Sequence, residues 1–169
     1  MNVKSKIAVA AFMALGLTSM NTMAAGNSGE VFFKGEVVDT PCNLAPGEAG
    51  QAVQVPFGQL SMAQLNANQQ VAQNFTIGLT GCALNGKTAV ITFSSDRADA
   101  TNTLIQTSGT ATGLGIGIDG YTFGTEKALN VTDGDNTLRF TAVAKRLAAG
   151  TDVTAGNFDA ISNFVINYK

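Results

Sequence analysis

Two cysteines are the residues whose chemistry is simplest to predict. Cys42 and Cys82 are the only cysteines, and the chain has no histidine. A metal-binding thiol pair or a Cys–His catalytic pair therefore has no support. In an oxidising compartment, two cysteines most simply form one disulfide. We predict a Cys42–Cys82 bond. Closing a loop of about 40 residues would restrict the unfolded chain by roughly 4 kcal/mol in the entropic model.

The carboxylates are the other groups that could do chemistry. Asp96 and Asp99 flank Arg97, and the sequence DGDN runs from Asp133 to Asn136. DGDN faintly resembles a calcium loop but lacks the closing Glu of an EF-hand, and Asp, Gly and Asn are also what a tight turn needs. We therefore predict a turn there and a solvated surface pair of Asp96 with Arg97. With no catalytic constellation, metal site or cofactor site in view, the sequence does not indicate an enzyme.

The first residues are typical of a secretory signal peptide. The cationic start MNVKSK precedes the apolar run IAVAAFMALGL and the small residues TMAAG. The apolar run is too short to span a bilayer, so a membrane anchor is the weaker reading. We expect residues 1–24 to be removed, with cleavage after Ala24 or Ala25, and no lipid anchor.

Charge excludes one class of partner. Removing Lys4 and Lys6 leaves 10 − 2 = 8 basic residues against 12 acidic ones, a net charge of −4. Such a protein is not basic enough to follow a phosphate backbone, so nucleic acid is not an expected partner.

Most of the remaining chain is typical of short strands divided by turns. Turn signals occur at Asn85-Gly86, Asp119-Gly120 and Asp133-Gly134, the first of them a strong hairpin signal. A single helical turn is predicted from Ser61, where Gln64 is placed for a capping box. This pattern favours an immunoglobulin-like β-sandwich, with a small closed barrel as the alternative. The predicted strands lie within 51–57, 69–82, 87–95, 113–118, 136–147 and 156–169, and Pro56 makes the first of them an edge strand or ends it.

Both ends of the mature chain have a face meant for burial. Val31, Phe33 and Val37 alternate with polar positions, and Gly29 and Gly35 fall in the same register. Glycine at two inward positions would weaken a strand in its own domain, but it lets a strand approach a crowded backbone closely. We infer that this segment fills a groove of another molecule.

The C-terminus shows the same alternation. Phe164, Ile166 and Tyr168 alternate up to the last residue, Lys169. Taken alone, this run is the last core strand of the domain.

Three features together resemble the pilus subunits of the Gram-negative chaperone–usher pathway, most closely the major rod subunits of type 1 fimbriae. The N-terminal register is Asn27, Gly29, Val31, Phe33 and Gly35. The second feature is the cysteine spacing, and the third is the C-terminal pattern of Gly156, Phe164, Ile166 and the penultimate Tyr168.

The resemblance implies an immunoglobulin-like sandwich that lacks its last strand. A periplasmic chaperone would lend a strand to the resulting groove, and at the outer-membrane usher the N-terminal extension of the next subunit would replace it. Gly29 would then occupy a tight pocket, Val31 and Phe33 the neighbouring ones, and Asn27 the position where exchange starts. Phe164, Ile166 and Tyr168 would line the groove and contact the chaperone.

The expected organisation is a donor-strand extension over residues 25–38 and a pilin domain over residues 39–169. The expected function is a structural subunit that polymerises head to tail into an extracellular fimbrium supporting adhesion. A minor adaptor or tip pilin is the nearest alternative. A secreted monomeric carbohydrate-binding β-sandwich is the alternative from another class, and a secreted enzyme ranks behind it.

Overall fold

A computed structural model describes residues 30–35, 37 and 40–169 of the 169-residue chain. The predicted signal peptide, its cleavage site, Asn27 and Gly29 lie outside the described residues. The chain divides into two units, Met1–Val37 and Val38–Lys169, and each is described by itself. Among the described residues, no helix is long and apolar enough to cross a membrane.

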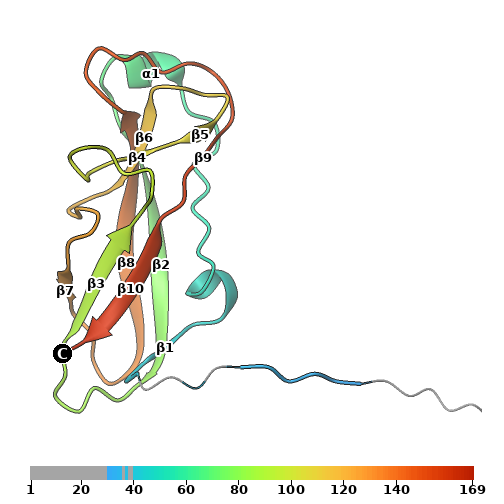
Figure 1. The fold of residues 1–169 in the computed structure, drawn as a ribbon, viewed down its shortest axis with the longest axis vertical. Coiled ribbons are helices and arrows are strands. Elements are labelled where there is room, and N and C mark those ends of the chain that lie inside the picture. Colours follow the sequence, from blue (N-terminus) through green and yellow to red (C-terminus); the bar gives the residue numbers. More distant parts are fainter. Residues whose placement is uncertain (1–29, 36, 38–39) are drawn as a thin grey trace, which may run out of the picture. The chain divides into compact units, whose positions relative to one another are not determined.

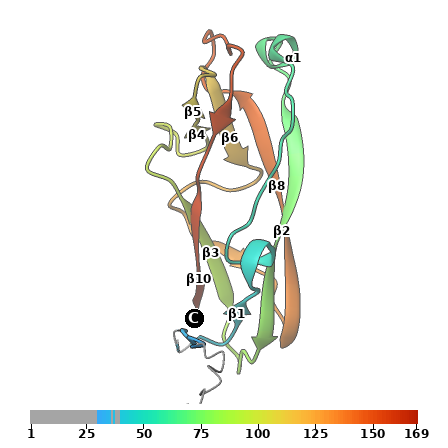
Figure 2. The same ribbon diagram turned by 90° about the vertical axis from the view of Figure 1, so that its right-hand side faces the viewer.

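The second unit is a two-layered antiparallel β-sandwich, as predicted (Figures 1 and 2). One layer is a five-stranded sheet of order β1-β2-β8-β6-β4, and the other is a three-stranded sheet of order β10-β3-β7, with β5 and β9 forming a further pair. The sheets are open, so the closed barrel is excluded. The bounds are β1 Asn43–Leu44, β2 Val71–Cys82, β3 Ala89–Ser94, β4 Ile105–Gln106, β5 Ser108–Gly109, β6 Leu114–Ile118, β7 Lys127–Leu129, β8 Gly134–Arg146, β9 Phe158–Asp159 and β10 Asn163–Tyr168.

Two helical turns complete the unit, a 3-10 turn η1 at Gly47–Ala49 and the helix α1 at Met62–Asn66. Ser61 is the N-cap of α1, as predicted, and its Oγ accepts a hydrogen bond from the Gln64 backbone N–H at 3.4 Å. Capping of this kind satisfies one of the free N–H groups at a helix start.

The main core lies between the two layers because β2, β8 and β3 each direct alternate side chains inward. Ile77, Ile91 and Phe140 are among the buried residues. The ring of Phe93 meets those of Phe140 and Phe164 with centroids 5.4 and 6.2 Å apart, so this cluster joins the two layers.

The predicted Cys42–Cys82 disulfide is present, and both residues are buried. It ties the chain just before β1 to the end of β2, while β1 itself pairs with β2 through Asn43 and Leu44. The start of the domain is therefore fixed to the five-stranded sheet.

The predicted hairpin at Asn85-Gly86 is wrong in its partners. Both residues have positive φ values, 50° and 85°, and the Lys87 N–H donates to the Leu84 carbonyl, so the local turn forms. However, the flanking strands belong to different sheets, β2 to the five-stranded one and β3 to the three-stranded one. The turn thus carries the chain from one layer to the other.

Candidate functional site: an open groove between two chain segments

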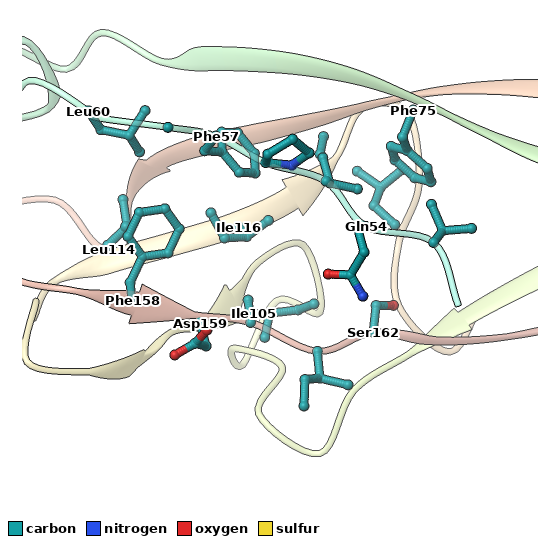
Figure 3. A pocket seen from close by; sticks show the side chains of 18 of the residues that line it. Gln54, Phe57, Leu60, Phe75, Ile105, Leu114, Ile116, Phe158, Asp159 and Ser162 are labelled. Atoms are coloured by element: carbon teal, nitrogen blue, oxygen red, sulfur yellow. The ribbon is translucent and has the colours of Figure 1, made fainter. Parts of the chain in front are cut away.

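A groove with a volume of about 1500 Å³ runs along the sandwich. One wall is the segment 51–60, and the other is the segment 153–164, which includes β9. In Figure 3, Phe57 and Leu60 come from the first wall and Phe158 from the second, with Leu114 and Ile116 between them. We call these segments the 51–60 wall and the 153–164 wall. The floor between them is apolar.

The 51–60 wall is not the predicted edge strand. Val53, Val55 and Phe57 are half-buried while Gln54 and Pro56 are exposed, so the expected alternation is present. However, residues 53–60 belong to no ladder, and within the described residues their backbone groups form no hydrogen bond. Backbone N–H and C=O groups are strong obligatory donors and acceptors, so this segment is ready to pair with an added strand.

The 153–164 wall continues into β10, which has a partner on one side only. β10 pairs with β3 over Asn163–Tyr168, and it is the edge strand of its sheet. Phe164, Ile166 and Tyr168 are half-buried and pack against the main core, which places these three predicted residues on one face. Burial raises the pKa of the Tyr168 phenol.

Gly156 lies seven residues before β10, where the chain crosses residues 110 and 111. A Cβ atom at Gly156 would lie 2.4 Å from the Ala111 backbone nitrogen, closer than two such atoms can approach. The glycine therefore lets the 153–164 wall pack tightly onto the loop that follows β5.

At the α1 end of the groove, α1 is hydrogen-bonded to the 153–164 wall. The Asn66 side chain donates its Nδ2 to the Val153 carbonyl at 3.1 Å, and its Oδ1 accepts from the Val153 N–H at 2.7 Å. Arg146 donates to the Asn66 carbonyl at 3.2 Å. A second buried cluster lies beside these bonds, made of Leu65, Leu114, Ile116, Ala144 and Val153 with Phe57, Leu60 and Phe158 packed against it.

The described N-terminal residues expose their apolar side chains. Val31, Phe33 and Val37 are 76%, 91% and 101% exposed, and Phe32 is 76% exposed. Val31, Phe33 and Val37 are the apolar positions of the predicted inward face, and Phe32 falls outside that register. A Cβ atom at Gly35 would meet nothing within 4 Å in this unit. Large apolar groups exposed in this number mark a segment that binds elsewhere.

The carboxylates have structural roles. The predicted turn at DGDN is wrong in its extent, because only Asp133 forms a bend and residues 134–136 already belong to β8. Asp133 Oδ1 accepts from the Leu84 N–H at 2.8 Å, and Asp135 Oδ1 accepts from the Gly81 N–H at 2.9 Å. Over the described part of the chain, no three acidic or cysteine side chains gather as a metal site would require.

The predicted Asp96–Arg97 pair is wrong, because the guanidinium turns to the backbone instead. Arg97 donates its Nε to the Gln106 carbonyl and a terminal nitrogen to the Thr107 carbonyl, at 2.9 and 3.1 Å. Asp99 instead accepts from the N–H groups of Thr103 and Leu104 and from the Thr101 hydroxyl, and so shapes the loop before β4.

Sequence reasoning missed Asn66 and the contact between Phe57 and Phe158. Asn66 and Val153 are 87 residues apart, and an asparagine at a helix end is unremarkable in sequence. Phe57 does fall in step with Val53 and Val55, and Phe158 lies between the polar residues Asn157 and Asp159. That alternation could have been used to place them on one groove.

Comparison with known proteins decides the family. The model of the family described as "Fimbrial protein" matches residues 31–169. The chain belongs to this family. It is 34% identical to the Fimbria A protein of Serratia marcescens, with 98% of each chain covered. It is 36% identical to the Type-1 fimbrial protein, A chain, of Escherichia coli K12, with 96% of this chain and 97% of the relative covered.

A solved structure agrees with these relatives. The fimbrial protein has 33% identity and a TM-score of 0.71 to a chain from a chaperone–usher pilus whose structure addresses rod uncoiling, covering 85% of this chain and 96% of the other. The sandwich of this pilin is therefore the immunoglobulin-like fold that lacks its last strand, and the pilin is a structural subunit of a pilus.

Proposed function

We propose that this pilin polymerises by donor-strand exchange, in which the N-terminal extension of one subunit fills the groove of the next. The observation that carries the proposal is residues 53–60 of the 51–60 wall, an extended segment without backbone pairing that faces the 153–164 wall across an apolar floor. A strand inserted between the two walls would pair with residues 53–60 on one side and with the free edge of β10, which begins in the 153–164 wall, on the other. It would also cover the apolar floor.

The N-terminal segment has the side chains that such a groove needs. Val31, Phe33 and Val37 are exposed apolar residues at every second or fourth position, and glycines occupy positions 29 and 35 between and beside them. Asn27 begins the same register. An inserted strand would point these residues at the floor while its other face stayed in solvent.

Insertion of the strand releases a large amount of free energy for a segment of this length. Burying Val31, Phe33 and Val37 contributes about 1.5 to 3 kcal/mol each, as an upper estimate. Each backbone hydrogen bond that forms adds about 0.5 to 1.5 kcal/mol. Dissociation would therefore be very slow, as a filament under shear requires.

The polymer grows head to tail because the extension and the groove are different surfaces. A heterologous contact that does not close into a ring generates an open filament. The partners are identical or related pilin subunits, and relatives named as a major fimbrial subunit or as a fimbrial major pilin favour a main repeating subunit over an adaptor.

Before assembly, the open groove needs protection. An unpaired edge beside exposed apolar side chains invites aggregation. We therefore propose that a periplasmic chaperone lends a strand to the groove, with contacts to Phe164, Ile166 and Tyr168, and that an outer-membrane usher exchanges it for the extension. The subunit would pass through the periplasm to an extracellular fimbrium. We infer no catalytic role for it.

The test is deletion of residues 26–35 from the full chain in a host with the matching chaperone and usher. We expect the wild-type chain to form filaments that resist mild denaturant and run as a ladder of oligomers. The deleted chain should be exported but stay monomeric. A variant with Glu30→Gln, which changes an exposed residue outside the inward face, is the matched control and should polymerise. Filaments of the deleted chain would disprove the mechanism.

A further inference from the structure

We propose that the inserted extension lies antiparallel to the 153–164 wall in one register, with Lys34 opposite Asp159 and Phe32 opposite Ile161 of the next subunit. The inference rests on the proposed function and adds to it the residues that fix the alignment of neighbouring subunits. A register slip of one residue would turn every inward side chain outward, so a strand of this kind must be held in place.

Charge supplies the first argument. Along the two walls, Asp159 is the only charged residue, and it is exposed. In Figure 3 its carboxylate lies on the opposite side of the 153–164 wall from the ring of Phe158. Within residues 27–37 Lys34 is the only base, and it falls on the outward face of the extension. A cation and an anion on the outward faces of two adjacent strands attract when they lie opposite each other.

Alternation then limits the registers. Residues directly opposite in an antiparallel pair lie on the same face of the sheet. Phe158 and Phe164 point toward the core, so even-numbered residues of the wall must face odd-numbered residues of the extension, such as Val31 and Phe33. The allowed registers therefore differ by steps of two residues. Lys34 opposite Asp159 is one of them.

Side-chain size selects the same register. Phe158 is already in contact with Phe57 of the other wall, their ring centroids 6.2 Å apart, so little room remains beside it. The proposed register places a glycine there and a second glycine beside the other phenylalanine, while the large residues of the extension face small ones. The inward pairs are Gly29 with Phe164, Val31 with Ser162, Phe33 with Ala160, Gly35 with Phe158 and Val37 with Gly156.

The neighbouring registers lose this match. A shift of two residues toward the start of the wall sets Phe33 against Phe158 and Gly35 against Gly156. The opposite shift sets Lys34 against the apolar Ile161 and leaves Gly35 opposite Ala160. The first shift makes the rings of Phe33 and Phe158 clash, and the second leaves a void beside Gly35. Close packing therefore disfavours both registers.

The outward faces supply an independent argument. Phe32 and Ile161 are 76% and 74% exposed, and each is out of place in its own unit. In the proposed register they lie opposite each other, one pair along from Lys34 and Asp159. A cross-strand apolar pair would shield both side chains from water. The contacts of the inward face do not account for the exposure of either residue.

Cysteine crosslinking in assembled filaments tests the register. The double variants Phe32→Cys/Ile161→Cys and Lys34→Cys/Asp159→Cys place thiols directly opposite, within the roughly 4.4 to 6.8 Å Cα separation that a disulfide allows. The matched controls Phe32→Cys/Asp159→Cys and Phe32→Cys/Asn163→Cys are shifted by two residues. After assembly, a mild copper-based oxidant is added, and boiled samples are run without reductant.

We expect most subunits of both test pairs to become covalent multimers and both controls to stay monomeric. Crosslinking of a control pair instead of the test pairs would overturn the register. Crosslinking at 32/161 but not at 34/159 would indicate a parallel strand and overturn it as well. Neither result would affect the donor-strand mechanism, which fails only if residues 26–35 are dispensable.

Charge exchange gives a second test that does not depend on thiols. Lys34→Asp or Asp159→Lys alone should speed filament dissociation in mild denaturant about two- to fivefold, the range for an exposed ion pair. The double exchange Lys34→Asp/Asp159→Lys should restore the wild-type rate. Equal effects of the single and double variants, or no effect of either, would overturn the pairing.

Discussion

The rings of Phe57 and Phe158 contact each other across the α1 end of the groove, with centroids 6.2 Å apart and planes inclined at 58°. This contact joins the two walls at that end of the groove. Because both rings are half-buried, we expect Phe158→Ala to destabilise the purified subunit by about 1 to 3 kcal/mol, less than truncation of a fully buried ring. Denaturant unfolding measures this loss.

The matched control is a double-mutant cycle with Phe57→Ala. A genuine contact between the rings should give a coupling energy of about 0.5 to 1.5 kcal/mol. Strictly additive effects would mean that each ring packs on the floor alone.

The polar contacts between α1 and the 153–164 wall centre on Asn66. Asn66→Ala would leave the N–H and C=O of Val153 without their partners and should cost about 1 to 3 kcal/mol. Asn66→Asp keeps the acceptor for the N–H but loses the donor, so its cost should be smaller. Hydrogen exchange at the Val153 amide should accelerate strongly in the alanine variant and little in the aspartate variant. Equal acceleration of exchange in the two variants would mean that the hydrogen bond to Asn66 Oδ1 does not protect the Val153 amide.

Among the contacts tested by these variants, the disulfide should make the largest contribution to the free energy of unfolding. The Cys42→Ala/Cys82→Ala variant frees a loop of about 40 residues and should lose roughly 4 kcal/mol in the entropic model. The unfolding midpoint of the oxidised and variant proteins measures the difference. The wild-type protein under reducing conditions is the control and should match the variant. A loss below about 1 kcal/mol would mean that the unfolded chain is already constrained.

The sequence predicted those features that local alternation determines. The long strands β2 and β8, the cap at Ser61 and the shared face of Phe164, Ile166 and Tyr168 follow from side-chain periodicity or from capping chemistry, so they could be read directly. The resemblance to chaperone–usher pilins added the missing strand. Periodicity alone would not have shown that the sheet is incomplete.

Long-range relationships were not predictable in this way. The turn at Asn85-Gly86 formed with the expected dihedral angles, but the turn itself does not determine which sheet each flanking strand joins. Likewise, the alternation of residues 51–57 indicated burial of one face, whereas hydrogen bonding depends on a partner strand that this chain does not place beside them. Both errors concern pairing.

A glycine in β6 is a further example of a long-range relationship that the sequence did not predict. A Cβ atom at Gly117 would lie 2.8 Å from the Thr103 carbonyl oxygen, so the glycine is required by close packing of the loop before β4. In the sequence GLGIGI, the same residue reads only as the polar-side position of an alternating strand. Every residue of β6 is in fact buried.

Tyrosine ionisation gives a pH dependence with a definite sign. Burial raises the pKa of both Tyr121 and Tyr168 above the ordinary value of 10.0, because the phenolate is poorly solvated there. The folded protein therefore binds these protons more tightly than the unfolded chain does. Their stabilising effect is complete below the unfolded pKa and is lost as the pH rises through the folded pKa.

We therefore expect the free energy of unfolding to fall as the pH rises above about 10. The Tyr121→Phe/Tyr168→Phe variant should lose less stability over the same range, since these are the chain's two tyrosines and no phenol then remains to ionise. Denaturant unfolding at neutral and alkaline pH measures both. An equal fall in the variant would assign the alkaline loss of stability to groups other than the two tyrosines.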